Sequence, residues 1–181
     1  METRKKILAI SGSTRQHSSN LTVLKAIAAL FSDRIEMSFF EGIATLPAFN
    51  PDDTDAAIAP VVQFRKQVQD ADGVIICTPE YAHGVPGALK NAIDWTVTTN
   101  EFNQKPTALI TASSDGRFGH AALLETLRTI EAKNVDQHQL IIPFIKTKTG
   151  DNNTITDITT LTAVNELVEQ LLLTIGSTTT V

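Results

Sequence analysis

Short runs of consecutive apolar residues alternate along the chain with longer segments in which apolar residues recur every three or four positions. The runs lack the polar alternation of a half-exposed strand, so they predict strands that are buried on both faces. The longer segments have the period of amphipathic helices. We expect strands at residues 6–10, 34–40, 73–77, 106–112 and 135–142, and helices at 20–31, 58–71, 86–97, 119–133 and 155–173.

Strand and helix therefore alternate five times, which predicts one α/β domain at residues 1–175 and a frayed tail at 176–181. Parallel strands that are apolar on both faces need helices on both sides. We expect a doubly wound five-stranded parallel sheet in a three-layer α/β/α sandwich. Ligands of such sheets bind at the carboxyl ends of the strands. The loops after the first, third and fourth strands are therefore the candidate site.

Composition excludes several classes of protein. The 181 residues are 42% hydrophobic and carry 15 basic and 20 acidic side chains, a net charge of −5. This acidic balance argues against nucleic acid or an anionic membrane as a partner. The single cysteine, Cys77, cannot form an internal disulfide and is expected to be a small core residue. The four histidines lack metal-ligand spacing, so we expect no metal. A cytoplasmic location is expected.

The loop after the first strand is rich in hydrogen-bond donors. Its sequence, SGSTRQHSSN at residues 11–20, leads directly into a helix. Free backbone N–H groups and the helix dipole favour an anion there, and hydroxyl and guanidinium groups add donors. The loop has neither the GxxxxGK[ST] nor the GxGxxG pattern, which argues against a P-loop nucleotidase and a dinucleotide site. A phosphate monoester fits best; the alternative is a capped helix start with Ser18 or Ser19 as N-cap.

The loop after the third strand, TPEYAHGVP at residues 78–86, combines two prolines with a glycine. Such a loop can present backbone N–H and C=O groups to a planar heterocycle while Tyr81 covers part of it. An ordinary strand-to-helix turn is the alternative reading of the same prolines and glycine.

Three segments together resemble the NAD(P)H-dependent FMN reductase family, which includes chromate, quinone and azo-dye reductases. They are GSTRxxSSN at residues 12–20, PEYAHGVPGALKNAIDW at 79–95 and SSDGRFG at 113–119. The stretch LPAFNP at 46–51 is similar to a further family segment, and the resemblance extends over residues 6–145. It implies a flavodoxin-like fold, bound FMN, and NADPH or NADH as hydride donor.

The resemblance also implies roles for individual residues. Those expected to hold the FMN phosphate come from the first loop: Ser13, Arg15, Ser18, Ser19 and Asn20. Those expected to contact the flavin ring and ribityl chain come from the later loops: Pro79, Glu80, Tyr81, Ala82, Gly84, Ser113 and Gly116. Two histidines in these loops, His83 and His120, are expected to touch substrate. Ala82 and Gly84 stand where the family usually has Asn and Ser, and His120 where it often has a glycine.

The expected activity is hydride transfer from NAD(P)H to FMN, then to a flavin, quinone, azo or chromate-type small-molecule acceptor by a ping-pong mechanism. The flavin carries the chemistry, so no protein catalytic residue is expected. The sequence does not distinguish NADPH from NADH. A homodimer or homotetramer is implied by the resemblance, and Trp95 and Ile93 belong either to the core or to a subunit interface. The alternative function is a flavodoxin-type FMN electron carrier that does not oxidise NAD(P)H.

Overall fold

The computed structural model describes residues 3–53 and 58–178, and its centre is a parallel sheet of five strands. The strands lie in the order β2-β1-β3-β4-β5, and each neighbouring pair is parallel. This is the strand order of flavodoxin-like folds. The strands are β1 (Lys5–Ser11), β2 (Ile35–Phe40), β3 (Gly73–Thr78), β4 (Thr107–Ala112) and β5 (Gln139–Ile142).

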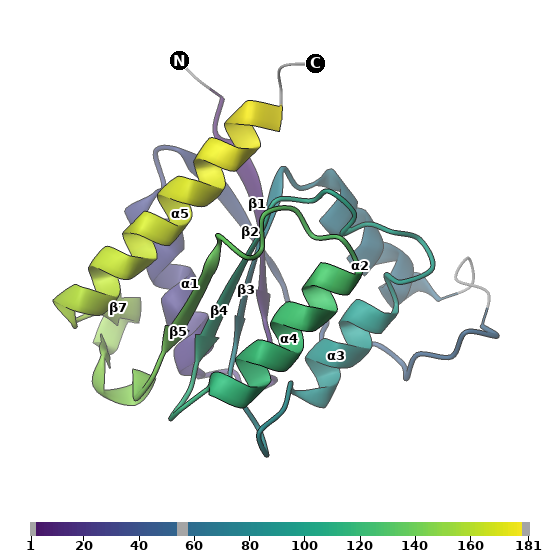
Figure 1. Cartoon of the computed structure of the whole chain (residues 1–181), viewed down its shortest axis with the longest axis horizontal. Helices are drawn as coiled ribbons and strands as arrows, with labels where there is room; N and C mark the ends of the chain where they lie inside the picture. The colour runs from purple at the N-terminus through teal and green to yellow at the C-terminus, as the bar shows by residue number, and fades with distance from the viewer. Residues whose placement is uncertain (1–2, 54–57, 179–181) are drawn as a thin grey trace.

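Helices cover both faces of the sheet (Figure 1). One face carries α1 (Ser19–Leu30) and α5 (Ile158–Thr178). The other carries α2 (Ala59–Asp70), α3 (Gly87–Asp94) and α4 (Arg117–Thr129). The predicted three-layer, doubly wound, flavodoxin-like architecture is therefore confirmed.

The core consists of two apolar clusters, one on each side of the sheet. Successive residues of β1 divide between them: Ile7 packs with α1 and α5, and Leu8 packs with α2, α3 and α4. Every residue of β3 and β4 is buried. Both faces of each central strand are therefore apolar, which is why the strands appear in the sequence as continuous apolar runs. Cys77 lies in this core, as predicted.

The segment between β5 and α5 was not predicted. It contains the 3-10 turns η2 (Ile145–Thr147) and η3 (Asp151–Asn153), and β6 (Thr149–Gly150) pairs with β7 (Thr154–Ile155) in a small hairpin against α1. The final helix accordingly begins later than predicted and ends later, at Thr178. Residues 176–178, expected in the frayed tail, are helical. Residues 179–181 of that tail lie outside the described residues.

The segment at 46–51 is tied to α3 by three hydrogen bonds. The Pro47 carbonyl accepts from Trp95 Nε1 at 2.9 Å and from Asn91 Nδ2 at 2.8 Å, and Asn91 Oδ1 accepts from the Phe49 N–H at 2.7 Å. Trp95 and Ile93 are both buried, which assigns them to the core.

None of the helices within 3–53 and 58–178 has the length and apolarity to cross a membrane.

Candidate functional site

A cavity of about 460 Å³ opens at the carboxyl edge of the sheet, where β1 and β3 lead into α1 and α3 on opposite faces. This is the topological switch point at which open α/β sheets bind ligands. Figure 1 shows the loops after β1, β3, β4 and β5 together at this lower edge. The lining residues come from all four loops: Ser13, Arg15, His17, Ser18, Ser19, Asn20, Pro79, Glu80, Tyr81, Ala112, Ser113, Ser114, Phe144, Ile145, Lys146 and Thr147.

The first wall is the start of α1. Ser18 is its N-cap, with the side-chain oxygen accepting from the Leu21 N–H at 3.1 Å. Ser19 and Asn20 are the first helical residues, so their N–H groups have no partner within the helix. The capping reading of Ser18 is thus confirmed, and the same geometry leaves helix N–H groups free for an anion. All five residues expected to hold phosphate line the cavity.

Close contact between the ends of β1 and β3 fixes the base of this wall. The Gly12 N–H donates to the Cys77 carbonyl at 2.8 Å. A Cβ on Gly12 would lie 2.2 Å from Thr78 Oγ1 and 2.7 Å from Thr78 Cβ, so only glycine permits this approach. Beside it, the Cys77 thiol donates to Asn20 Oδ1 at 3.3 Å, and burial raises the pKa of that thiol. Cys77 is therefore an inert anchor for Asn20 rather than a redox group.

Arg15 differs from the other arginines of the chain. The guanidinium groups of Arg4, Arg34, Arg65, Arg117 and Arg128 each contact a carboxylate or a carbonyl oxygen. Among the described residues, no hydrogen bond or ion pair involves the Arg15 guanidinium. An unpaired arginine in an acidic protein, placed beside an open helix start, is suited to bind an anionic ligand.

The whole cavity carries more basic than acidic groups. Arg15 and Lys146 line it against one carboxylate, that of Glu80, which already accepts from the Gly119 N–H at 2.6 Å. The chain as a whole has a net charge of −5, so the basic lining is local. A hydroxyl-rich helix start with a free guanidinium, next to apolar and aromatic walls, fits the phosphate and the ring of FMN.

The second wall comes from the β3–α3 loop. Pro79, Glu80 and Tyr81 line the cavity, as expected. Ala82 and Gly84 do not, because the chain turns back at this point in a tight turn bridged by Tyr81 and Gly84. His83 also points elsewhere: its ring stacks on Phe118 with 4.5 Å between ring centroids. The expected contacts of Ala82, Gly84 and His83 with flavin or substrate are therefore not supported by their positions.

The third wall is the β4–α4 loop. Ser113 lines the cavity, as expected, together with its neighbour Ser114 and with Ala112, which was not predicted. Gly116 is the N-cap of α4 with a φ of 98° and does not line the cavity, so its position does not support the expected flavin contact. Its left-handed backbone lets the chain turn from the loop into the helix.

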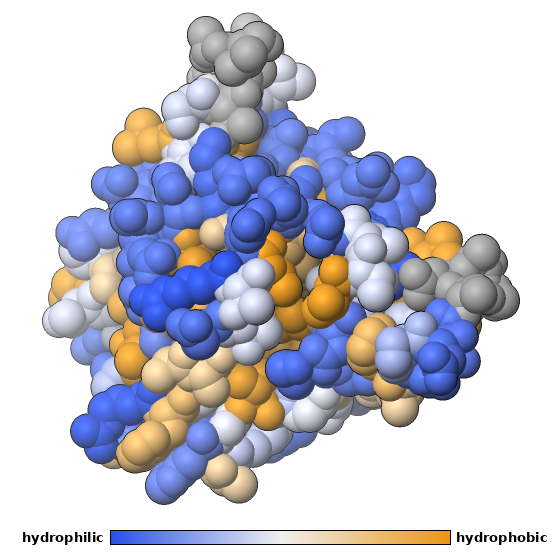
Figure 2. All heavy atoms as spheres, turned by 45° about the vertical axis from the view of Figure 1, so that its right-hand side comes forward, coloured by the Kyte–Doolittle hydropathy of each residue, from blue (hydrophilic) through white to orange (hydrophobic). Residues whose placement is uncertain are grey.

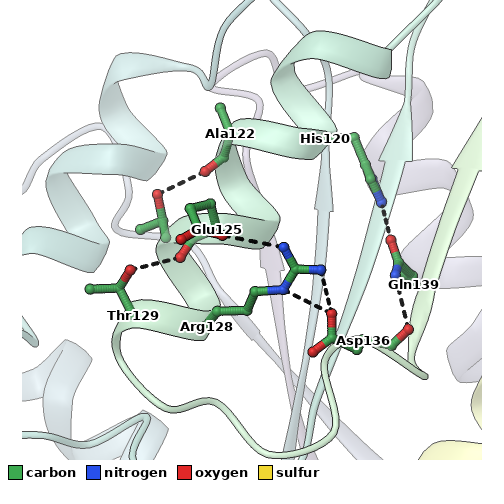
Figure 3. A network of polar contacts seen from close by, with 8 residues as sticks. His120, Ala122, Glu125, Arg128, Thr129, Asp136 and Gln139 are labelled. Carbon is green, nitrogen blue, oxygen red and sulfur yellow. Dashed lines mark hydrogen bonds and ion pairs between the residues drawn. The ribbon is translucent and has the colours of Figure 1, made fainter.

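His120 is not at the cavity surface, contrary to prediction. It is 5% exposed and lies between α4, β4 and β5. Gln139 Nε2 donates to the Asp136 carbonyl, so Gln139 Oε1 accepts from His120 Nε2 at 2.8 Å, and His120 Nδ1 accepts from the Thr111 hydroxyl at 2.9 Å. Figure 3 shows the ring aimed at Gln139. Burial lowers the pKa of His120, so it is a neutral structural residue.

The fourth wall was missed entirely. Phe144, Ile145, Lys146 and Thr147 follow β5 and close the cavity on the side of α1. Phe144 is 68% exposed and has a φ of 54°, an uncommon conformation for a bulky residue. The carboxyl ends of parallel strands lie at one edge of the sheet, so the loop after the fifth predicted strand could have been included in the candidate site from the sequence.

Within the described residues, no three His, Cys, Asp or Glu side chains form a group able to hold a metal.

Residues 5–147 match the family profile described as NADPH-dependent FMN reductase. The chain is 35% identical over 144 residues to an NAD(P)H-dependent FMN reductase of Pseudomonas aeruginosa, covering 76% of this chain and 77% of that protein. It is 34% identical over 136 residues to a quinone reductase of Escherichia coli K12, covering 72% and 71%. The solved structure of the flavoenzyme NAD(P)H:(acceptor) oxidoreductase FerB from Paracoccus denitrificans has the same fold, with a TM-score of 0.79, 24% identity, and coverage of 96% and 98%.

The matched region contains all five strands of the sheet and all four walls of the cavity. Fold, cavity and sequence relationship therefore agree with the resemblance first seen in the loop segments. The chain belongs to the NADPH-dependent FMN reductase family and is an oxidoreductase with FMN as its flavin and NAD(P)H as its hydride donor.

Proposed function

We propose that the chain binds FMN in the four-walled cavity and reduces a small-molecule acceptor there in a ping-pong cycle, with NAD(P)H as the hydride donor. The observation that carries the proposal is Arg15, whose guanidinium has no protein partner among the described residues and stands beside the open start of α1. FMN bound there would supply the hydride chemistry of the reaction, and the residues of the chain would hold and orient it.

The residues of the chain bind and orient the ligand. Arg15 and the N–H groups of Ser19 and Asn20 neutralise the phosphate, with the Ser13 hydroxyl as a further donor. Tyr81 and Phe144 are 50% and 68% exposed and provide aromatic surface on two sides of the same cavity. Aromatic faces at an open site suit flat, conjugated acceptors. Quinones, azo compounds and free flavins are of this kind, and chromate is the charged alternative.

A spectroscopic titration tests the proposal. The protein loaded with FMN is mixed without oxygen with NADPH or with NADH, and the visible absorbance of the flavin is followed. We expect bleaching with at least one donor and recovery of the colour on addition of a benzoquinone. Initial rates at varied donor and acceptor concentrations should give the parallel double-reciprocal lines of a ping-pong mechanism. Flavin that binds but is bleached by neither donor would instead indicate an electron carrier.

We also propose that the chain forms a homodimer or homotetramer. Figure 2 shows apolar side chains exposed among polar ones on the side of the molecule that carries α3 and α4. Phe118 at the start of α4 and Val97 after α3 are each about half exposed. Light scattering should give a mass of two or four chains, and Phe118→Asp should lower that mass.

A cytoplasmic location is likewise a proposal, supported by a single cysteine that has no partner for a disulfide.

A further inference from the structure

The Tyr81–Gly84 turn is a rigid unit at the mouth of the cavity. The Tyr81 N–H donates to the Gly84 carbonyl at 3.1 Å, and the Gly84 N–H donates back to the Tyr81 carbonyl at 2.9 Å. The two central residues, Ala82 and His83, have φ values of 49° and 57°. These are the features of a two-residue type I′ turn. Because the turn is closed on itself, the backbone at Tyr81 moves only if the whole unit moves.

Two contacts hold this turn against the start of α4, and a glycine permits the close approach. Glu80 Oε2 accepts from the Gly119 N–H at 2.6 Å. The His83 ring stacks on Phe118 at 4.5 Å, with an angle of 28° between the rings. Gly119 has no side chain to hold the turn away: a Cβ there would lie 2.9 Å from the Gly84 carbonyl oxygen and 3.1 Å from Glu80 Cγ.

Glu80, the residue that precedes the turn, makes hydrogen bonds both to the β4–α4 loop and to the first turn of α4. Its backbone N–H donates to Ser113 Oγ at 3.3 Å, while its carboxylate accepts from Gly119. The N-cap of α4 is Gly116, and it makes no side-chain capping hydrogen bond. The Glu80 carboxylate therefore supplies the acceptor that the first turn of α4 lacks, at the positive end of the helix dipole.

We propose that Glu80 is a positioning residue: it fixes Tyr81 at the mouth of the flavin cavity by fastening the Tyr81–Gly84 turn to α4. The inference rests on the proposed function, because Tyr81 is the half-exposed aromatic residue of the second wall. It changes the role expected for Glu80, whose carboxylate serves a helix N–H rather than the flavin. Tyr81 makes the contact with the acceptor, and Glu80 acts through it.

The chain contains one tyrosine, which makes the test direct. Protein labelled with 3-fluorotyrosine and loaded with FMN should give one sharp ¹⁹F resonance from position 81. In Glu80→Ala the resonance should broaden and move toward the value of the free amino acid. In Glu80→Gln it should return toward the original position, because the amide oxygen still accepts from Gly119. Glu125→Gln removes one negative charge from an exposed site on the same helix and should leave the resonance unchanged.

Kinetics supply the second measurement. The KM for a benzoquinone acceptor should rise about tenfold in Glu80→Ala, the factor expected for one charge-assisted hydrogen bond, and recover in Glu80→Gln. Gly119→Ala applies the same perturbation from the helix side and covers the case in which Glu80→Ala does not fold. Alanine favours α4 itself, yet its Cβ displaces the turn, so the resonance and the KM should change in the same direction.

The two proposals fail in distinguishable ways. If the unmodified protein takes up no FMN or is not reduced by NAD(P)H, the proposed function is wrong. If it is reduced normally, and both Glu80→Ala and Gly119→Ala keep the original ¹⁹F resonance and KM, the positioning role of Glu80 is overturned.

Discussion

Replacing Gly12 with alanine perturbs the junction of β1 and β3 at the base of the cavity. The added Cβ would lie 2.2 Å from Thr78 Oγ1, 2.7 Å from Thr78 Cβ and 2.9 Å from Leu89 Cδ2, whereas ordinary contacts begin near 3.4 Å. Rotation of Thr78 moves its Oγ1 but not its Cβ, so the two backbones must separate by roughly half an ångström or more. Overpacking that shifts backbone destabilises by about 1–3 kcal/mol, and we expect the upper half of that range.

Function should be lost together with stability. Ser13 follows Gly12 and Pro79 follows Thr78, and both line the cavity, so displacement of the strand ends also moves two residues of the site. We therefore expect Gly12→Ala to bind FMN more weakly than the original protein under conditions in which both are folded.

Urea denaturation without FMN measures the effect, with Gly87→Ala as the matched control. Nothing lies within 4 Å of a Cβ at Gly87, the first residue of α3, so alanine there should raise the free energy of unfolding by up to about 1 kcal/mol. The two glycine substitutions should thus change stability in opposite directions. If Gly12→Ala unfolds at the same urea concentration as Gly87→Ala, the close approach of β1 and β3 is not what requires glycine.

Further predictions concern buried groups and the missed wall. Burial lowers the pKa of His120 and His138, so the unfolded chain binds protons that the folded chain does not; the free energy of unfolding should fall as the pH drops below about 6.5, by at most about 1.4 kcal/mol per pH unit for each histidine. His138→Gln should flatten this profile in urea titrations, and an unchanged slope would contradict the assignment. Cys77, buried and with a raised pKa, should react with a thiol reagent only after unfolding, and rapid labelling of the native protein would disprove its core role. Phe144→Gly should keep or raise stability by up to about 1 kcal/mol, because it relieves a left-handed backbone, while weakening FMN in calorimetry; unchanged FMN affinity would remove Phe144 from the site.

The centre of the sheet was predictable because β1, β3 and β4 are buried on both faces along most or all of their length and appear as unbroken apolar runs. β6 and β7 were not, since strands of two residues have no periodicity to detect. The start of β5 was placed four residues early because Val135 is buried in a turn that precedes the strand. An apolar residue in a turn has the same local pattern as the first residue of a strand.

Loop sequence alone was enough to bring together the residues of the hydroxyl-rich start of α1, which all line the cavity. Where the orientation of a side chain decides, some of the expected residues do not line it. His120 stands at helical spacing with the buried residues Leu123, Leu124 and Leu127, a period that indicates the core face of α4. Ala82 and His83 lie in a turn that reverses away from the cavity, and the backbone angles that cause this are not evident from their residue types.

Calorimetry with FMN and riboflavin tests most directly whether the start of α1 holds the flavin phosphate. Arg15→Ala should weaken FMN by about 1.5–3 kcal/mol, the range for hydrogen bonds to charged groups, and leave the weaker binding of riboflavin unchanged. Lys25→Ala removes one positive charge from an exposed position on the same helix and should affect neither ligand appreciably. Equal affinities of the original protein and Arg15→Ala for FMN, or equal losses for both flavins, would contradict the account.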